Sequence, residues 1–348
     1  MNELTQILTE TAERLLADHA GKETVKAAED GHWPEALWAA LEENGLTQPL
    51  VPEQQGGIGA GWEDAFVIAL AAGRHRAPVP LPETIAAGWL LAAAGIPVPA
   101  GPIALADDLD AVAWGAAAPH AVAVTPDGGG WQVQLLSREG ADAAADLSLA
   151  SEPRDRMRYG KADATGTLPF AAGNDAVSPL RLLGAAMRAT QIAGAAGRAI
   201  EFAVDHAMTR RQFGRPIAKF QAIQQTLARA AAHAAEARMA AHVAFRALEG
   251  GDLVRAEFAV ASAKVVASEA ADVITDAVHQ VHGAIGFTEE HELHFTTRRM
   301  WSWQAEFGSS GFWAERLGRA VLTRGAANLW PDVVGADIAA DPGTASAT

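Results

Sequence analysis

Three long helical segments rich in alanine fill most of the second half of the sequence, and they constrain the fold more than any other feature. They span residues 179–208, 217–249 and 253–283, and a shorter segment follows around residues 293–325. Ser178 and Pro179 are the residue types of an N-cap and a first helical turn, and Gly250-Gly251 ends the second segment. Because helices with small residues on their faces pack closely, we predict an antiparallel four-helix bundle over residues 176–328.

The rest of the chain consists of two regions with different residue patterns. In residues 1–102, apolar side chains repeat at helical spacing between turns that contain glycine or proline, which predicts a helical domain. Residues 103–172 hold short alternating or β-branched runs, AVAVTP and WQVQLLS among them, with the composition of a hairpin turn at residues 126–130. We therefore predict a mainly α-helical protein with a small β domain in the middle and a disordered tail at residues 329–348.

Composition excludes several classes of function. The 348 residues include 42 acidic and 27 basic side chains, for a net charge of −15, and no cysteine. Without cysteine the chain has no disulfide, thiolate zinc site or cysteine nucleophile, which is compatible with a reducing cytoplasm. The acidic balance disfavours nucleic-acid binding, because neutralising phosphates requires clustered Lys and Arg.

The sequence predicts neither a signal peptide nor a membrane span. The first twenty residues carry four acidic side chains and have no basic region followed by an apolar one. The most apolar later stretch, residues 84–106, is interrupted repeatedly by glycine and proline, and a span needs roughly 20 apolar residues in a row. We expect a soluble, cytoplasmic protein.

Two patterns could be taken for ligand sites, but each has a simpler explanation. The glycines of GGIGAGW (residues 56–62) suggest a dinucleotide fingerprint, yet Trp62 stands at the third glycine position and no strand clearly precedes it. Two histidine pairs, His279/His282 and His291/His294, have the i, i+3 spacing of metal ligands on a helix. Glycines break the helix between the pairs, so nothing makes the four side chains converge. We predict no metal site and place these histidines at a helix end or a subunit contact.

The stretch RRQFGRPIAKFQAIQ, residues 210–224, is different in kind. Two arginines precede a Phe-Gly that interrupts the helical pattern, and a second helix starts near Phe220. Guanidinium groups match phosphate oxygens, and the following helix presents free N–H groups at its start. From the residues alone, the stretch is either a site for a diphosphate or an exposed helix junction.

This stretch and VHQVHGAIGFTEEHELHFTTRR (residues 278–299) closely resemble the two C-terminal signatures of the acyl-CoA dehydrogenase family. The run LWAALEENGLTQPLVPEQQGGIG (residues 37–59) resembles the pattern of the family's first domain. The resemblance implies an N-terminal helical domain, a middle β-barrel-like domain and a C-terminal four-helix bundle. It also implies an FAD enzyme, commonly a tetramer, that removes a proton and a hydride from an acyl-CoA thioester. Electrons would pass to an electron-transfer flavoprotein or a similar acceptor.

The signatures also imply, position by position, which residues would contact FAD. Arg210 would hold the diphosphate, with Phe213 near the adenine and Gln221 beside it. From a neighbouring subunit, the nucleotide would be lined by Gln280, Gly283, Ala284 and Gly286. The family favours a second glycine where this chain has alanine.

The family's catalytic base is missing at both of its usual positions. Members carry a glutamate either on the segment after the second signature or on the long helix before the first, and these positions hold Phe307 and Gly184 here. Glu306 is the nearest carboxylate, but on a helix it would point about 100° away from its neighbour. The β domain is also short and lacks the stretches that usually close over the flavin ring.

These departures leave three hypotheses open. The first is a short, degenerate family member, resembling the small subunits of bacterial steroid-degrading heterotetramers, which needs a partner chain to supply the base. The second is an active homo-oligomeric acyl-CoA dehydrogenase with a displaced base, for which Glu306 is the candidate. The third is a non-catalytic scaffold homologue that binds neither flavin nor thioester. No feature of the sequence favours a fourth possibility, a flavin-dependent oxygenase or oxidase on the same fold.

Overall fold

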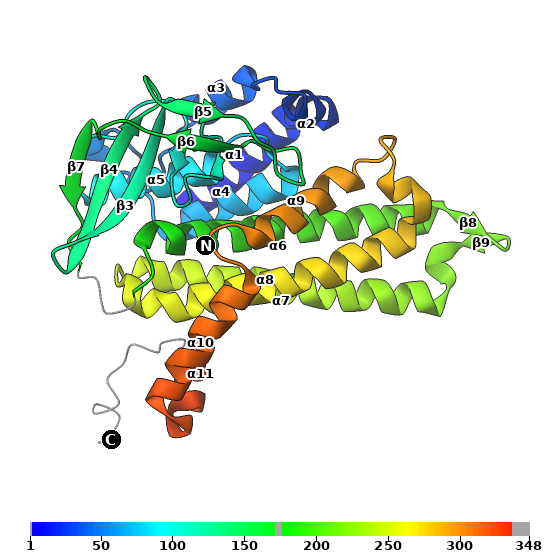
Figure 1. The fold of residues 1–348 in the computed structure, drawn as a ribbon. Helices are drawn as coiled ribbons and strands as arrows, with labels where there is room; N and C mark the ends of the chain where they lie inside the picture. Colours follow the sequence, from blue (N-terminus) through cyan, green and yellow to red (C-terminus); the bar gives the residue numbers. More distant parts are fainter. Residues whose placement is uncertain (1, 171–175, 336–348) are drawn as a thin grey trace.

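The computed structural model describes residues 2–170 and 176–335, and it begins with a group of helices (Figure 1). These are α1 (Glu3–His19), α2 (Lys22–Glu29), α3 (Glu35–Glu43), α4 (Trp62–His75) and α5 (Leu81–Ala93), with a short 3-10 turn η1 (Glu53–Gln55). The glycine-rich loop leads directly into α4, where the backbone N–H of Gly61 donates to Asp64 at 2.9 Å. It is therefore a connection between helices.

The middle domain contains two small sheets. One has the strand order β1-β3-β4-β7 and the other β2-β6-β5. The strands are β1 (Ile103–Leu105), β2 (Val112–Ala113), β3 (His120–Asp127), β4 (Gly130–Ser137), β5 (Asp142–Ala144), β6 (Arg154–Arg158) and β7 (Ala164–Thr167). Gly128 and Gly129 turn between β3 and β4 with φ of +56° and +88°, which confirms the predicted hairpin turn. The first sheet packs against α5 of the preceding domain.

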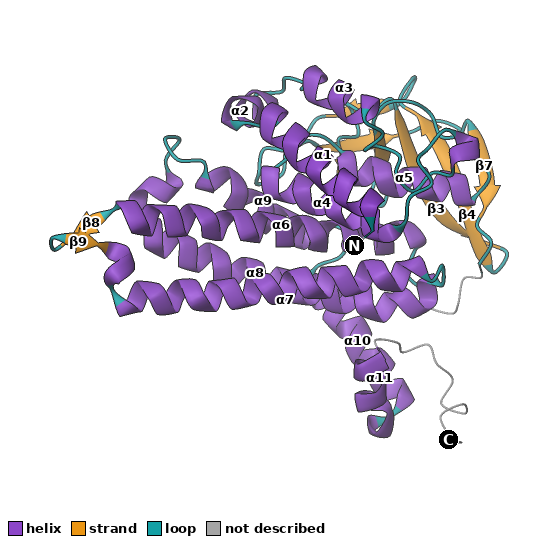
Figure 2. Ribbon diagram, turned by 180° about the vertical axis from the view of Figure 1, so that it is seen from behind, coloured by secondary structure: helices purple, strands orange, loops and turns teal. Residues whose placement is uncertain are grey.

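The C-terminal half contains the predicted long helices. They are α6 (Pro179–Thr209), α7 (Gln221–Glu249), α8 (Leu253–His282), α9 (Leu293–Ala305), α10 (Ser310–Arg324) and α11 (Leu329–Gly335), with 3-10 turns η2 (Ile217–Lys219), η3 (Gly283–Phe287) and η4 (Ala326–Asn328). Helices α6, α7 and α8 lie side by side along the molecule, and α9 lies beside α6 and α8 (Figure 2). The mainly α-helical architecture with a small β domain is thus confirmed.

Two helix boundaries differ from the prediction. The last segment, expected as one helix around residues 293–325, is broken at residues 306–309, because Phe307 and Gly308 have φ of +52° and +95°. We predicted a disordered tail from residue 329 onward, but residues 329–335 form α11. Pro331 is tolerated there, since the first turn of a helix leaves its N–H groups without helical partners. Residues 336–348 lie outside the described part of the chain.

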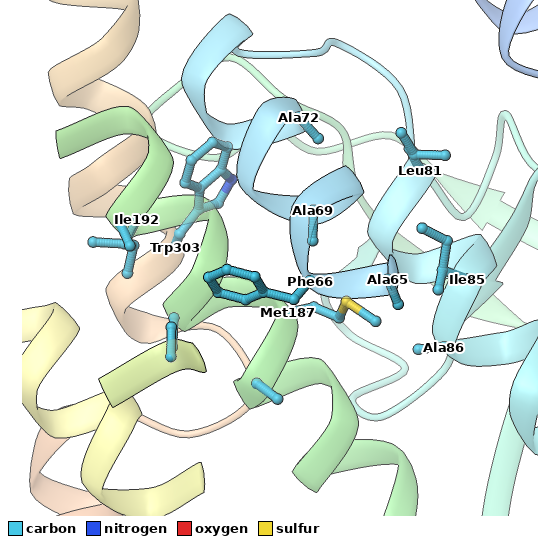
Figure 3. Close-up of a cluster of buried hydrophobic side chains, with 14 of the residues drawn as sticks. Ala65, Phe66, Ala69, Ala72, Leu81, Ile85, Ala86, Met187, Ile192 and Trp303 are labelled. Atoms are coloured by element: carbon cyan, nitrogen blue, oxygen red, sulfur yellow. The ribbon is translucent and has the colours of Figure 1, made fainter. Parts of the chain in front are cut away.

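Close contact between α4 and α6 joins the N-terminal domain to the bundle. A Cβ atom at Gly73 would lie 2.1 Å from the carbonyl oxygen of Gln191, and one at Gly194 would lie 2.1 Å from that of Leu70. The helices therefore meet backbone to backbone, which only glycine allows. Near this crossing, Phe66 of α4, Met187 of α6 and Trp303 of α9 belong to one apolar core. Ile85 of α5 belongs to the same core and lies on the side of α4 away from Trp303 (Figure 3).

Within the described residues, no helix combines the length and the apolar composition that crossing a bilayer requires.

Different elements lie at the two ends of the bundle. The β domain covers one end, and a short hairpin of β8 (Arg211–Gln212) and β9 (Arg215–Pro216) projects from the other (Figures 1 and 2). Helices α10 and α11 extend from the side of the bundle away from the N-terminal helices.

Candidate cofactor site and active-site crevice

The first signature forms the hairpin at the end of the bundle farthest from the β domain (Figure 1). Arg210 is the C-cap residue of α6, and it is followed by β8 (Arg211–Gln212) and β9 (Arg215–Pro216). Between the strands, Phe213 has φ +49° and a side chain that is 91% exposed. Helix α7 then begins at Gln221. Guanidinium groups and the free N–H groups of the first turn of α7 are thus presented at one exposed end of the molecule.

The second signature lies at the same end of the bundle. Gln280 is exposed on the last turn of α8, and Gly283, with φ +63°, follows that helix. Ala284 and Gly286 belong to η3. A Cβ atom at Gly286 would lie 3.1 Å from Nδ1 of His279, so the close approach of η3 to α8 favours glycine at this position.

A pair of imidazole rings joins the two signatures. The rings of His206, one turn before Arg210, and His282, directly before Gly283, stack with 4.6 Å between their centroids. His291 lies 4.6 Å from His282 with its ring nearly perpendicular. The seven residues predicted for the nucleotide therefore come from segments that the fold brings to one end of the bundle. Their contact with FAD stays a prediction.

Burial makes these histidines neutral at physiological pH. It lowers the pKa of His206 and His282, and it lowers the pKa of His291 to about 4, with further contributions from the two neighbouring imidazoles. In the described ranges, no group of three or more His, Asp or Glu side chains has the arrangement of a metal site. The cluster contributes packing between α6, α8 and the segment before α9.

A crevice of about 360 Å³ lies between the β domain and the C-terminal helices. This volume falls in the range of small-molecule sites, roughly 300–1,000 Å³. Its lining residues are Leu105, Asp107, Asp108, Ala111, Ala113, Arg154, Arg181, Ala305, Glu306, Phe307, Gly308 and Phe312. Nε of Arg181 donates to Asp107 at 2.8 Å and so connects α6 with the loop after β1. Burial raises the pKa of Asp107, against the opposing effect of Arg181.

Gly184 and Phe307, the residues at the two positions predicted for the family's base, lie in direct contact beside this crevice. A Cβ atom at Gly184 would lie 2.4 Å from two ring carbons of Phe307 and 2.7 Å from a third, so the ring rests on the backbone of α6. The guanidinium carbon of Arg188 lies 5.6 Å from the centre of the same ring. The aromatic ring therefore fills the space that a side chain at position 184 would need.

Two arginines hold Glu306, the candidate for a displaced base. Its carboxylate accepts hydrogen bonds from Nε of Arg188 at 2.7 Å and from Nη2 of Arg154. Burial alone would raise the pKa of Glu306, but the two guanidinium groups outweigh it and lower the pKa to about 2. Because proton transfer is efficient when the base has a pKa near the working pH, this carboxylate is a weak proton acceptor.

Glu306 belongs to an ion network that crosses all three domains. The network alternates acidic and basic side chains: Glu83, Arg188, Glu306, Arg154, Glu152, Arg299, Glu29 and Arg298. Arg188 stays charged because Glu306 and Glu83 counteract the effect of its complete burial, which by itself would lower its pKa. The acids and bases balance, which is the condition under which such charges can be buried.

Sequence reasoning missed this network. Its members are spread from α2 to the break after α9, and no local spacing connects them. The only signal in the sequence was that Arg181 and Arg188 lie on the same predicted helix, at a distance of two turns. Both meet carboxylates, but only the packing of that helix decides that Arg188 joins this network and Arg181 pairs with Asp107.

Models of two acyl-CoA dehydrogenase domains match the chain. The N-terminal domain matches residues 2–96, and the C-terminal domain matches residues 182–322. Acyl-CoA dehydrogenase IpdE2 of Mycobacterium tuberculosis is 31% identical over 309 residues, which cover 84% of this chain and 90% of that protein. Its counterpart in Mycolicibacterium smegmatis is 29% identical, with 86% and 93% covered.

Solved structures share the fold at lower identity. The ChsE4-ChsE5 complex from Mycobacterium tuberculosis matches with a TM-score of 0.77 and 21% identity, over 92% of this chain and 97% of that chain. PigA with FAD and proline matches with a TM-score of 0.76 and 14% identity, over 93% and 99%. The two domain models and the relatives that span most of the chain agree with the fold and with both signatures. The chain belongs to the acyl-CoA dehydrogenase family of oxidoreductases.

Proposed function

We propose that this chain is a subunit of a mixed acyl-CoA dehydrogenase oligomer, which contributes to binding the nucleotide end of FAD and has no catalytic base of its own. The family reaction takes a proton from the α carbon and a hydride from the β carbon of an acyl-CoA thioester. The acceptor for this hydride would be supplied by bound FAD. The partner chain supplies the glutamate, and an electron-transfer flavoprotein or a similar acceptor takes up the electrons.

The contact between Phe307 and Gly184 is the observation that carries this proposal. The residues at the two predicted base positions, a glycine and a phenylalanine, have no group that can accept a proton, and they pack on each other. The nearest carboxylate, Glu306, is ion-paired with Arg154 and Arg188, so its pKa is about 2. A positioned base contributes roughly 10²–10⁴ in rate, and we infer that the described residues of this chain supply none.

The nucleotide-end residues fit FAD better than the crevice does. Arg210 lies beside a hairpin with two further arginines, and the first turn of α7 offers free N–H groups to a diphosphate. At Gly283, with φ +63°, an added Cβ atom would meet no atom within 4 Å, so the backbone of the second signature is open to a close approach there. The crevice, in contrast, contains the Arg181–Asp107 ion pair and the Phe307 ring where the reacting groups would meet.

The comparisons support a partner chain. Two solved structures of this fold are described as pairs, ChsE4-ChsE5 and the steroid acyl-CoA dehydrogenase Tcur3481-Tcur3483. We extend the proposal to a tetramer that acts in the cytoplasm on a lipid or steroid thioester. Native mass spectrometry, cell fractionation and a panel of straight-chain and steroid thioesters test these three parts.

Turnover by the isolated chain separates a partner-dependent subunit from an enzyme with a displaced base. We expect the purified chain to oxidise acyl-CoA thioesters at no more than about one hundredth of the rate of an assembly with a base-bearing partner. Glu306→Gln should leave that residual rate unchanged, as should Glu315→Gln, a matched control on the exposed face of α10. Robust turnover that Glu306→Gln abolishes and Glu315→Gln does not would refute the proposal.

Flavin binding separates both of these possibilities from a scaffold. The assembly with its partner should be yellow, and Arg210→Ala should weaken FAD binding about tenfold or more, as loss of a charge-assisted contact with phosphate predicts. Arg319→Ala on α10 removes an exposed arginine away from both signatures and serves as the control. An assembly that stays colourless with added FAD would favour the scaffold homologue.

A further inference from the structure

Lys264 on α8 is a buried cation that the proposed function does not use. Its side chain is fully enclosed, and Nζ donates to the carbonyl oxygens of Trp303 at 3.1 Å, Gln304 at 2.7 Å and Gly308 at 3.0 Å. An ammonium group has three N–H donors, so each donor has one carbonyl partner. Burial lowers the pKa of Lys264 to about 7, and the charge of Glu306 counteracts this effect.

The three carbonyl groups belong to the end of α9 and to the break that follows it, residues 306–309. The last carbonyls of a helix have no partner within that helix, and they carry a partial negative charge. Trp303 and Gln304 are in the last turn of α9, and Gly308 is in the break. Lys264 therefore caps α9 from a different helix, about 40 residues earlier in the chain.

The break is held from its other side by α10. Nε1 of Trp313 donates to the carbonyl oxygen of Phe307 at 3.0 Å. Phe307 has φ +52°, which residues other than glycine rarely adopt, and Gly308 has φ +95°. A Cβ atom at Gly308 would lie 2.7 Å from ring atoms of Phe312 and Trp313. The backbone at 307–308 is thus confined between Lys264 and the first turn of α10.

We propose that Lys264 is the positioning residue of the break and selects the backbone conformation that presents residues 306 and 307 to the crevice. With the carbonyls of 303, 304 and 308 fixed, the side chain of Glu306 turns toward Arg154 and Arg188. The ring of Phe307 then packs on Gly184. Lys264 acts only through the backbone of the break, and this role does not depend on whether the chain works alone or with a partner.

Hydrogen exchange tests this role with a graded series at position 264. Lys264→Met removes every donor, and Lys264→Gln keeps two N–H donors without the charge. We expect the amides of residues 302–305, in the last turn of α9, and the indole N–H of Trp313 to exchange about tenfold faster in Lys264→Met and by a smaller factor in Lys264→Gln, while α6 keeps its protection. Ser268→Ala is the matched control. Ser268 is buried one turn later on α8, and its hydroxyl donates to the Lys264 carbonyl at 2.7 Å, away from the break.

Each outcome of the series decides the proposal. Faster exchange confined to these N–H groups, largest in Lys264→Met and intermediate in Lys264→Gln, supports it, and Lys264→Gln alone carries this comparison if Lys264→Met does not fold. Equal acceleration at these groups, in α6 and in α8 would show that Lys264 contributes only to global stability, which overturns the proposal. Unchanged exchange at these groups would show that Trp313 and the ion network suffice to hold the break, which also overturns it.

Discussion

Replacing Gly184 with alanine tests whether the Phe307 ring rests on α6 and closes both base positions. In a helix interior without steric conflict, Gly→Ala stabilises by about 0.5–1 kcal/mol, because glycine loses more backbone entropy on folding. Here the added Cβ would lie 2.4 Å from the ring carbons, whereas carbon atoms in contact are normally about 3.5–4.0 Å apart. Overpacking of this kind costs about 1–3 kcal/mol. We expect Gly184→Ala to lower the free energy of unfolding by about 0.5–2 kcal/mol.

The same helix provides the control. A Cβ atom at Gly197 would meet no atom within 4 Å, so Gly197→Ala should raise the free energy of unfolding by about 0.5–1 kcal/mol. Phe307→Ala removes the ring, and in that background Gly184→Ala should also become stabilising. The double-mutant cycle between positions 184 and 307 should therefore give a coupling energy of about 1–3 kcal/mol.

Urea unfolding followed by far-UV circular dichroism measures all four variants with one signal. Two results would contradict the contact: Gly184→Ala as stabilising as Gly197→Ala, or a coupling energy within the roughly 0.3–0.5 kcal/mol expected of independent sites. Either result would mean that the ring does not occupy the space above Gly184. Packed apolar groups would then not stand in place of the predicted glutamate.

Two further predictions concern the buried charges and the histidines. Arg188→Met leaves Glu83 and Glu306 without their shared partner, so the free energy of unfolding should fall by about 3–5 kcal/mol in urea titrations; a loss below about 1 kcal/mol, typical of an exposed pair, would contradict the network. Burial, together with neighbouring imidazoles, lowers the pKa of His279 and of His291 to about 4, so between pH 6.5 and 4 the unfolded chain binds protons that the folded chain excludes. The melting temperature should therefore fall as the pH drops through this window and depend less on pH above it, and a rise in melting temperature on acidification from pH 6.5 would contradict the assignment.

Much of the fold could be predicted because its signals are local. The long helices follow from runs of alanine and aliphatic residues with glycine or proline at their ends, and the β3–β4 hairpin follows from two glycines between alternating runs. The break at 306–309 could not be predicted in this way. Gly308 alone does not distinguish it from glycines inside helices, such as Gly194, and the hydrogen bonds to its carbonyls come from Lys264 and Trp313 on other helices.

The candidate site, like the fold, could be predicted only where its signals are local in the sequence. The two signatures are contiguous stretches, so the sequence alone predicted the nucleotide-end residues and the absence of the usual glutamate. It could not show that the two vacant base positions touch, because Gly184 and Phe307 are more than a hundred residues apart and meet only when α6 packs beside the break. Nor could it show that Glu306 is bound by Arg188, 118 residues earlier, and Arg154, 152 residues earlier.

The sequence by itself determined the family, the order of helical and β domains and the residue types at each signature position, because these depend on neighbours along the chain. Only the tertiary structure decided what the altered positions do. The pKa of a carboxylate and the room around a glycine are set by atoms brought close from distant segments. In this protein those atoms are two arginines around Glu306 and one aromatic ring over Gly184.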